Sequence, residues 1–268
     1  MIPLRDNIPS RTTPVVTYGI IVVCVLAFLA QLAGDRELVE RYGMIPARVV
    51  DPDQRVEIVV GVRPVLTPRG VERVPVRRPA APSAVPEWMT MLTSVFLHGG
   101  WIHLLSNMWF LFIFGDNVED CFGHFGYLIF YLGCGVAASA AHLAINYDSP
   151  IPTIGASGAI AGVMGAYMYL YPHARVLALV PLFLFFFVTV LPASLFLGIW
   201  FLLQFFSGVA AITAANAGGV AWWAHIGGFV VGVGIAWLLN ETHHLRPRVA
   251  TVHPGTEHTR FHRGGPAW

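Results

Sequence analysis

The sequence predicts an all-α, polytopic membrane protein in which six transmembrane helices form a bundle. Hydrophobic residues make up 56% of the 268 residues and charged residues only 12%, with a mean hydropathy of +0.64. This composition is too apolar for a soluble globular domain. A helix needs roughly 20 apolar residues to cross a bilayer, and long stretches without any charged residue recur along the chain. These uncharged stretches are 12–34, 88–115, 121–147, 149–174 and 176–240.

The last of these stretches supplies the fifth and sixth helices. It has room for two spans of roughly 20 residues each, with about 25 residues left for loops and interfacial turns. The first apolar run, 15–32, is longer than the apolar region of a cleaved signal peptide and has no clear small-residue cleavage site. We therefore expect it to be the first membrane helix.

The chain divides into three predicted parts. A short cytoplasmic N-terminal segment, 1–12, precedes a six-helix membrane domain over 13–241, and a His-, Arg- and Gly-rich tail, 242–268, is expected to be a disordered cytoplasmic segment. The first loop, 35–87, is long and carries nine arginines and eight acids, so we expect it to be solvated. Its valine-rich part, 56–65, favours a short hairpin, while the prolines after Val74 argue against a longer regular element.

Basic residues near the ends of the predicted spans orient the bundle. Arg5 and Arg11 precede the first span, Arg175 follows the fourth, and Arg246 and Arg248 follow the sixth. Because cytoplasmic loops are enriched in arginine and lysine, these ends should be cytoplasmic. Both termini are then expected inside the cell.

Charge and cysteine usage exclude several classes of function. The net charge of +1 gives no concentrated basic face, so no nucleic-acid partner is expected. The three cysteines lack CxxC spacing and are interpreted as packing residues. His98 and His103 are spaced too unfavourably for a metal site, and no HExxH motif occurs, so no metal is expected.

Four polar residues lie inside predicted spans and are the candidates for chemistry: His103, Asn107, Ser157 and His225. Polar side chains in a membrane are costly, so they mark function by default, although hydrogen bonding between helices is the alternative interpretation. Rises of about 20 to 22 Å separate His103, Ser157 and His225 from the predicted cytoplasmic ends of the second, fourth and sixth helices. Since these helices run in one direction, the three side chains should share a depth.

Ser157 is the predicted nucleophile and His225 its general base. Prolines 150 and 152 prevent regular helix before Ser157, which therefore lies near a helix N-terminus with free backbone N–H groups. Such donors suit an acyl-transfer oxyanion, and His103 and Asn107, one turn apart, could donate to it as well. Between Val176 and Asn240 there is no carboxylate, so a dyad rather than a triad is predicted.

Small residues favour close contact between the fourth and sixth helices. Gly158-x3-Gly162 and Gly228-x3-Gly232 are repeats that let helix backbones approach in lipid, and Gly155 lets backbone and substrate approach near Ser157. This contact would bring the serine and histidine together.

These residues resemble the pattern of the rhomboid family of intramembrane proteases. The likeness extends over nearly all of the predicted spans, including 92–98 and 114–120, and is similar to bacterial-type members. The motifs that carry it are His98-x4-His103-x3-Asn107, Gly155-Ala156-Ser157-Gly158 and Ala224-His225-x2-Gly228-x3-Gly232.

The resemblance implies a six-helix core in the bacterial inner or plasma membrane and cleavage of single-span membrane proteins by Ser157 and His225. It also implies an oxyanion site using His103 and Asn107, and no cofactor. The partners would be transmembrane substrates and the lipid bilayer. Some members carry a tyrosine four residues after the serine, where this chain has Ala161, so stacking against His225 would have to come from elsewhere, with Trp222 or Trp223 as candidates.

Two other functions remain open on the sequence alone. One is a catalytically silent relative that binds membrane helices, against which the retained Ser157 and His225 argue. The other is a channel or transporter using the histidines as an ion path, against which the lack of an embedded carboxylate argues.

Overall fold

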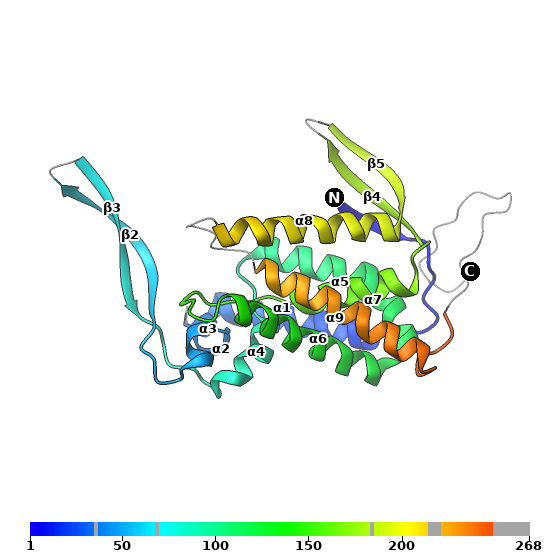
Figure 1. Cartoon of the computed structure of the whole chain (residues 1–268), viewed down its shortest axis with the longest axis horizontal. Coiled ribbons are helices and arrows are strands. Elements are labelled where there is room, and N and C mark those ends of the chain that lie inside the picture. Colours follow the sequence, from blue (N-terminus) through cyan, green and yellow to red (C-terminus); the bar gives the residue numbers. More distant parts are fainter. Residues whose placement is uncertain (35–36, 68–69, 183–184, 214–220, 249–268) are drawn as a thin grey trace.

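A computed structural model describes residues 1–34, 37–67, 70–182, 185–213 and 221–248. Its core is a bundle of long helices that lie side by side (Figure 1). The long helices are α1 (Val15–Ala33), α5 (Trp101–Phe122), α6 (His124–Ile145), α7 (Ser157–Leu170), α8 (Ala193–Thr213) and α9 (Trp222–Glu241). Shorter helices precede α5: α2 (Leu38–Tyr42), α3 (Pro46–Val50), η1 (Glu87–Met89), α4 (Thr90–Thr93) and η2 (Ser94–Phe96).

Four of the described helices, α1, α6, α8 and α9, are long and apolar enough to cross a membrane. Helix α5 has a similar length but ends on a run that contains three acids. Helix α7 is apolar but has only 14 residues, a rise of about 21 Å against a hydrocarbon core of roughly 30 Å. The chain is therefore a multi-pass helical membrane protein, and the count of six spans stays a prediction.

Helix α7 is the centre of the bundle. It contacts α5, α6, α8 and α9, and most of its residues are buried. Glycine and alanine make up much of its sequence, so neighbouring helices approach its backbone on several sides. The helix ends at Leu170 because Pro172 disfavours helical geometry in the residue before it.

The contact between α7 and α9 depends on glycines. A Cβ built on Gly228 would overlap the carbonyl oxygen of Gly158, and one built on Gly232 would overlap that of Gly162. Each of these pairs leaves no room for a side chain on α9. The two helices therefore pack backbone against backbone.

The acids near the end of α5 have a structural role that explains their presence in an apolar helix. Glu119 is buried and accepts hydrogen bonds from the backbone N–H groups of Val16 (2.9 Å) and Thr17 (2.8 Å) at the start of α1. Asp120 accepts from the backbone N–H groups of Arg11 (2.6 Å) and Thr12 (3.0 Å). Glu119 thus satisfies N–H groups that have no partner within α1 and interacts favourably with the dipole of that helix, and Asp120 holds the segment just before it.

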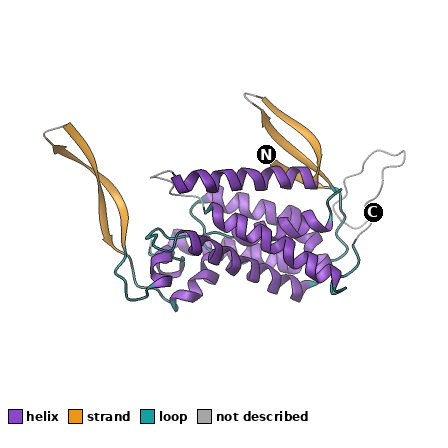
Figure 2. Cartoon of the chain, in the orientation of Figure 1, coloured by secondary structure: helices purple, strands orange, loops and turns teal. Residues whose placement is uncertain are grey.

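Two antiparallel hairpins make the prediction of an all-α chain wrong outside the helical core (Figure 2). Strands β4 (Arg175–Leu182) and β5 (Phe185–Pro192) form one, and β1 (Ile2–Asp6) pairs with β4 to complete a three-stranded sheet. The stretch that forms β4 and β5 was predicted to consist of loops and interfacial turns. A short, continuously apolar run has no periodicity that would distinguish a strand from a helix. Its β-branched and aromatic residues are the feature that favours a strand.

The second hairpin is longer than predicted. Strands β2 (Glu57–Thr67) and β3 (Gly70–Pro79) pair along their whole length, although β3 contains Pro75. A two-stranded hairpin has a free edge on each strand, where proline costs no ladder hydrogen bond. The prolines after Val74 are therefore compatible with the strand that they were expected to prevent.

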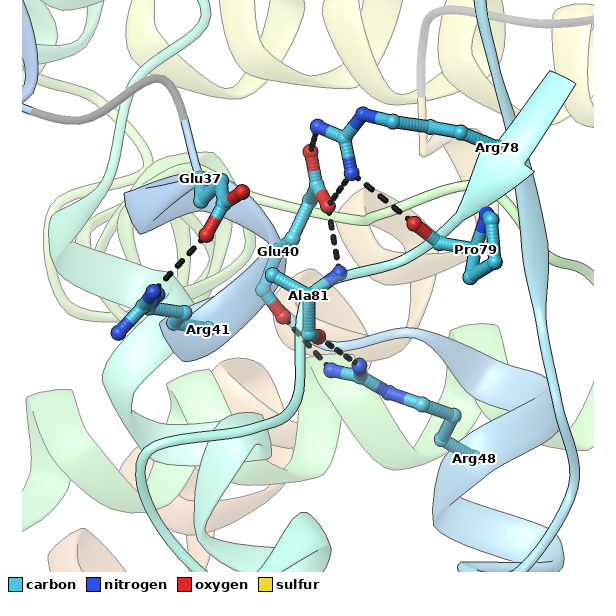
Figure 3. Close-up of polar contacts among 7 residues, drawn as sticks. All are labelled: Glu37, Glu40, Arg41, Arg48, Arg78, Pro79 and Ala81. Carbon is cyan, nitrogen blue, oxygen red and sulfur yellow. Dashed lines mark hydrogen bonds and ion pairs between the residues drawn. The ribbon is translucent and has the colours of Figure 1, made fainter.

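Buried charges fix the root of the β2–β3 hairpin to the short helices α2 and α3 (Figure 3). Glu40 is 6% exposed. Its carboxylate accepts hydrogen bonds from the Arg78 guanidinium (2.7 and 2.9 Å) and from the backbone N–H of Ala81 (2.7 Å). Arg48 donates to the carbonyl oxygens of Ala81 (2.7 Å) and Glu40 (2.6 Å). A buried carboxylate is tolerated here because it is paired and fully hydrogen-bonded.

Replacing Glu40 with glutamine is expected to loosen this root. The neutral amide removes the charge that pairs with Arg78 and presents donors where only acceptors fit. Amide hydrogen exchange over 76–82 should accelerate about tenfold or more. The matched control, Glu37→Gln, breaks a half-exposed pair with Arg41 and should leave exchange there unchanged; equal effects of the two changes would contradict this account of the root.

Candidate active site

A cavity of about 900 Å³ opens between α5, α7, α8 and α9. All four polar residues singled out from the sequence line it, together with Gly99, Trp200 and Gln204. Most of the remaining wall is apolar. The residues that complete it are Gly100, Trp101, Ile102, Ser106, Phe110, Ile154, Ile160, Met164 and Ala221.

Ser157 and His225 meet in this cavity. Ser157 is the first residue of α7 and His225 lies in the first turn of α9, and the serine Oγ is 2.7 Å from the histidine Nε2. The glycine contact between the two helices sets this distance, because a wider separation of the backbones would move the side chains apart. The pair is within hydrogen-bond reach for proton transfer.

The other ring nitrogen of His225 also has a partner. Nδ1 lies 2.7 Å from Oε1 of Gln204 on α8. A carbonyl oxygen only accepts hydrogen bonds, so with the amide in this orientation Nδ1 is the donor and Nε2 is left to accept from the Ser157 hydroxyl. Gln204 was not among the residues predicted from the sequence. It is the only Asn, Gln or charged residue within α8, and this is the signal that could have identified it.

His103 lies against the backbone just before Ser157. Gly155 has φ of +130°, and a Cβ at this position would lie 2.8 Å from Nε2 of the His103 ring. The backbone N–H of Gly99 points at Nδ1 of His103 at 3.3 Å. Because Nδ1 accepts this bond, the neutral ring carries its proton on Nε2, the nitrogen that lies against Gly155.

Asn107 brings a buried donor to the same wall. Its side chain is 7% exposed, and Nδ2 has no hydrogen-bond partner within the described part of the chain. A buried amide without a partner is unusual, since it costs free energy to desolvate. It is available to a group that enters the cavity.

The segment before Ser157 is held from two sides. The backbone N–H of Gly155 donates to the carbonyl oxygen of Ser94 (2.9 Å), and Met44 and Thr153 exchange two backbone hydrogen bonds (2.7 and 3.1 Å). The first loop and the turns before α5 thus fix the start of α7.

Comparison with known proteins decides the family. The family profile described as "Rhomboid domain" matches residues 85–242, more than half of the chain. The chain belongs to the rhomboid family. The match covers every helix that lines the cavity, while the β2–β3 hairpin and most of the long loop of this rhomboid lie outside it.

Curated relatives support the same assignment. This rhomboid is 30% identical over 164 residues to Rhomboid-like protein 11, chloroplastic, of Arabidopsis thaliana, an alignment that covers 58% of the chain and 54% of the relative. It is 31% identical over 164 residues to Rhomboid protein 1, mitochondrial, of Saccharomyces cerevisiae, an alignment that covers 57% of the chain and 42% of that relative. Over 83 residues it is 41% identical to Rhomboid protease GluP of Bacillus subtilis, and this alignment covers 31% of the chain and 16% of GluP. The chain thus spans about half or less of the length of these relatives.

Aromatic rings flank His225 in this rhomboid, although Ala161 stands at the position expected to supply a stacking tyrosine. Trp200 of α8 lies with its ring centroid 5.9 Å from that of His225 at an interplanar angle of 37°. Trp222 approaches edge-on at 6.2 Å and 88°. Trp222 was one of the two residues predicted to flank His225, whereas Trp200, one turn before Gln204, was not predicted.

Proposed function

We propose that this rhomboid is an intramembrane serine endopeptidase in which Ser157 is the nucleophile and His225 the general base. The observation that carries the proposal is the 2.7 Å contact between Ser157 Oγ and His225 Nε2 at the wall of a cavity within the bundle. A serine hydroxyl is a weak nucleophile until a neighbouring base removes its proton. The similarity to GluP, which is named as a rhomboid protease, is consistent with this activity.

The reaction follows from the two hydrogen bonds of His225. Ser157 Oγ attacks the carbonyl carbon of the scissile peptide while its proton passes to Nε2. The tetrahedral intermediate collapses as the C–N bond breaks, and the Nε2 proton goes to the leaving amine. Water then attacks the acyl-enzyme ester with Nε2 as base again, which releases the acid product and restores the serine. Side chains and backbone supply every group, so the proposal requires no metal or cofactor.

Three donors would stabilise the oxyanion: the backbone N–H of Ser157, Nε2–H of His103 and the amide of Asn107. The first belongs to a helix N-terminus, whose N–H groups have no partner within the helix. The apolar wall strengthens each of these interactions with a developing negative charge. The unpartnered amide of Asn107 is the strongest support for this part of the proposal.

Replacing Asn107 with alanine is expected to lower kcat about 10²-fold or more with little change in KM, because the amide would bind the oxyanion rather than the substrate. Folding should be preserved, since Nδ2 makes no hydrogen bond within the described residues. Ser106→Ala, at the next position and in the same cavity, is the control and should stay close to wild type. A wild-type kcat for the Asn107 variant would remove this residue from the proposed site.

The proposed substrates are transmembrane segments of other membrane proteins. A helical substrate must unwind before its backbone reaches Ser157, so glycine, proline or other helix-weakening residues are expected near the cleaved bond.

We also propose that α5 and α7 complete a six-span bundle, that both termini are cytoplasmic, and that the protein resides in a bacterial inner membrane. Cysteine accessibility from each side of intact vesicles tests this topology.

The function itself is tested with the full chain in liposomes together with a single-span reporter that carries a Gly-rich transmembrane segment. Mass spectrometry of the products is expected to locate the cut inside that segment. A reporter with a polyleucine segment should resist cleavage. Products cut only in the soluble parts, or none in any helix-weakened segment, would contradict the proposal.

A further inference from the structure

The segment of the chain that carries both His225 and Gln204 contains no acid that could orient the imidazole. No Asp or Glu occurs between Val176 and Asn240. Within the described part of the chain, the titratable groups that act on His225 are two other histidines, His103 of α5 and His142 of α6. The ring is nevertheless hydrogen-bonded at both nitrogens, to Ser157 and to Gln204.

Gln204 determines which ring nitrogen is free to act as a base. With the carbonyl oxygen of Gln204 at Nδ1, the neutral imidazole must hold its proton there and leave a lone pair on Nε2. Without this acceptor, the proton can occupy Nε2 instead, and a ring in that tautomer donates to Ser157 and cannot remove its proton. Trp200, one turn earlier on α8, packs on the ring and limits its rotation. One helix therefore provides both constraints.

We propose that Gln204 is a positioning residue that holds His225 in the tautomer needed for proton removal from Ser157. This inference rests on the proposed Ser157 and His225 chemistry. An amide suits the position because a carboxylate would place an isolated charge in an apolar wall, where desolvation is costly. The arrangement retains the orienting function of a third residue without its charge.

Two variants separate orientation from structure. Gln204→Met keeps a similar length and removes the acceptor, whereas Gln204→Glu keeps an acceptor and adds an ionisable group. Leu203→Met, at an exposed neighbouring position of α8, is the matched control. The readout is the rate of Ser157 modification by a fluorophosphonate across pH, with the full chain in nanodiscs and its melting temperature measured in parallel.

The Gln204→Met variant is expected to react about 10- to 100-fold more slowly than wild type, which is the range for a lost hydrogen bond to a buried donor. Gln204→Glu should recover most of this loss at alkaline pH. A carboxylate at Nδ1 favours the charged imidazolium. As the pH is lowered, the rate of this variant should therefore begin to fall at a higher pH than the rate of the wild type. If Gln204 only filled space, restoring an acceptor at Nδ1 would not recover the rate. Leu203→Met should match wild type.

A wild-type rate for Gln204→Met, or a Gln204→Glu profile that is unshifted and as slow as that of Gln204→Met, would overturn the inference. If Gln204→Met fails to fold, the Gln204→Glu profile alone decides. Nitrogen-15 NMR of histidine-labelled chain makes the test independent of activity. The His225 resonances, assigned by their loss in His225→Ala, should report a protonated Nδ1 in wild type, and a protonated Nε2 would refute the inference. A protonated Nδ1 in a chain that neither reacts nor cleaves would instead refute the proposed function.

Discussion

Replacing Ser157 with alanine is expected to reduce cleavage of a transmembrane reporter at least about 10⁴-fold, because the nucleophile is lost while the cavity and the oxyanion donors remain. The hydroxyl is one of two hydrogen-bond partners of His225, whose other bond to Gln204 persists. The fold should therefore be retained, and the melting temperature should change little. Rates are measured by quantifying product peptides from the liposome assay.

The matched control is Ser194→Ala, an exposed serine at the start of α8 that does not line the cavity. It should cleave at the wild-type rate. Residual cleavage by the Ser157 variant within tenfold of wild type would show that another group attacks the peptide. The proposed mechanism would then be wrong even if the chain is a protease.

Replacing Gly232 with valine is expected to have the largest effect on the fold. A Cβ at this position would overlap the carbonyl oxygen of Gly162, and backbone atoms cannot move aside without separating α7 from α9. We expect a loss of about 3 kcal/mol or more of stability, at the upper end for overpacked sites. Because the same contact sets the distance between Ser157 and His225, fluorophosphonate reaction should fall as well.

Gly234→Val provides the control for this prediction. It makes the same change two residues later on α9, where a Cβ meets nothing within 4 Å. Both variants carry the same loss of helix propensity, so a difference in melting temperature reports the packing at Gly232. Equal melting temperatures would contradict the role of this helix contact.

The helical core could be predicted from sequence because its signals are local. Uncharged stretches place the long helices, and prolines 150 and 152 place the start of α7 at Ser157. Glycine repeats indicated that α7 and α9 approach closely, and the structure places Gly228 and Gly232 against the α7 backbone. The polar residues that were singled out on these helices line one cavity.

What the sequence left open depends on tertiary context. Gln204 is one polar residue in an apolar helix, and its rotation toward His225 depends on how α8 packs on α9. The β4–β5 hairpin was missed because an apolar run without a period fits several structures. The extension of β3 through Pro75 depends on the edge position of that strand, which becomes evident only once its pairing is known.

The central claim is that the imidazole of His225 activates the hydroxyl of Ser157 within the bundle. The most direct measurement is peptide mapping by mass spectrometry after the full chain in nanodiscs reacts with a fluorophosphonate. We expect a single adduct on Ser157 in the wild type and none in a His225→Ala variant that is folded to the same extent. An adduct on Ser157 that forms equally fast in both proteins, or an unmodified Ser157 in the wild type, would contradict this claim.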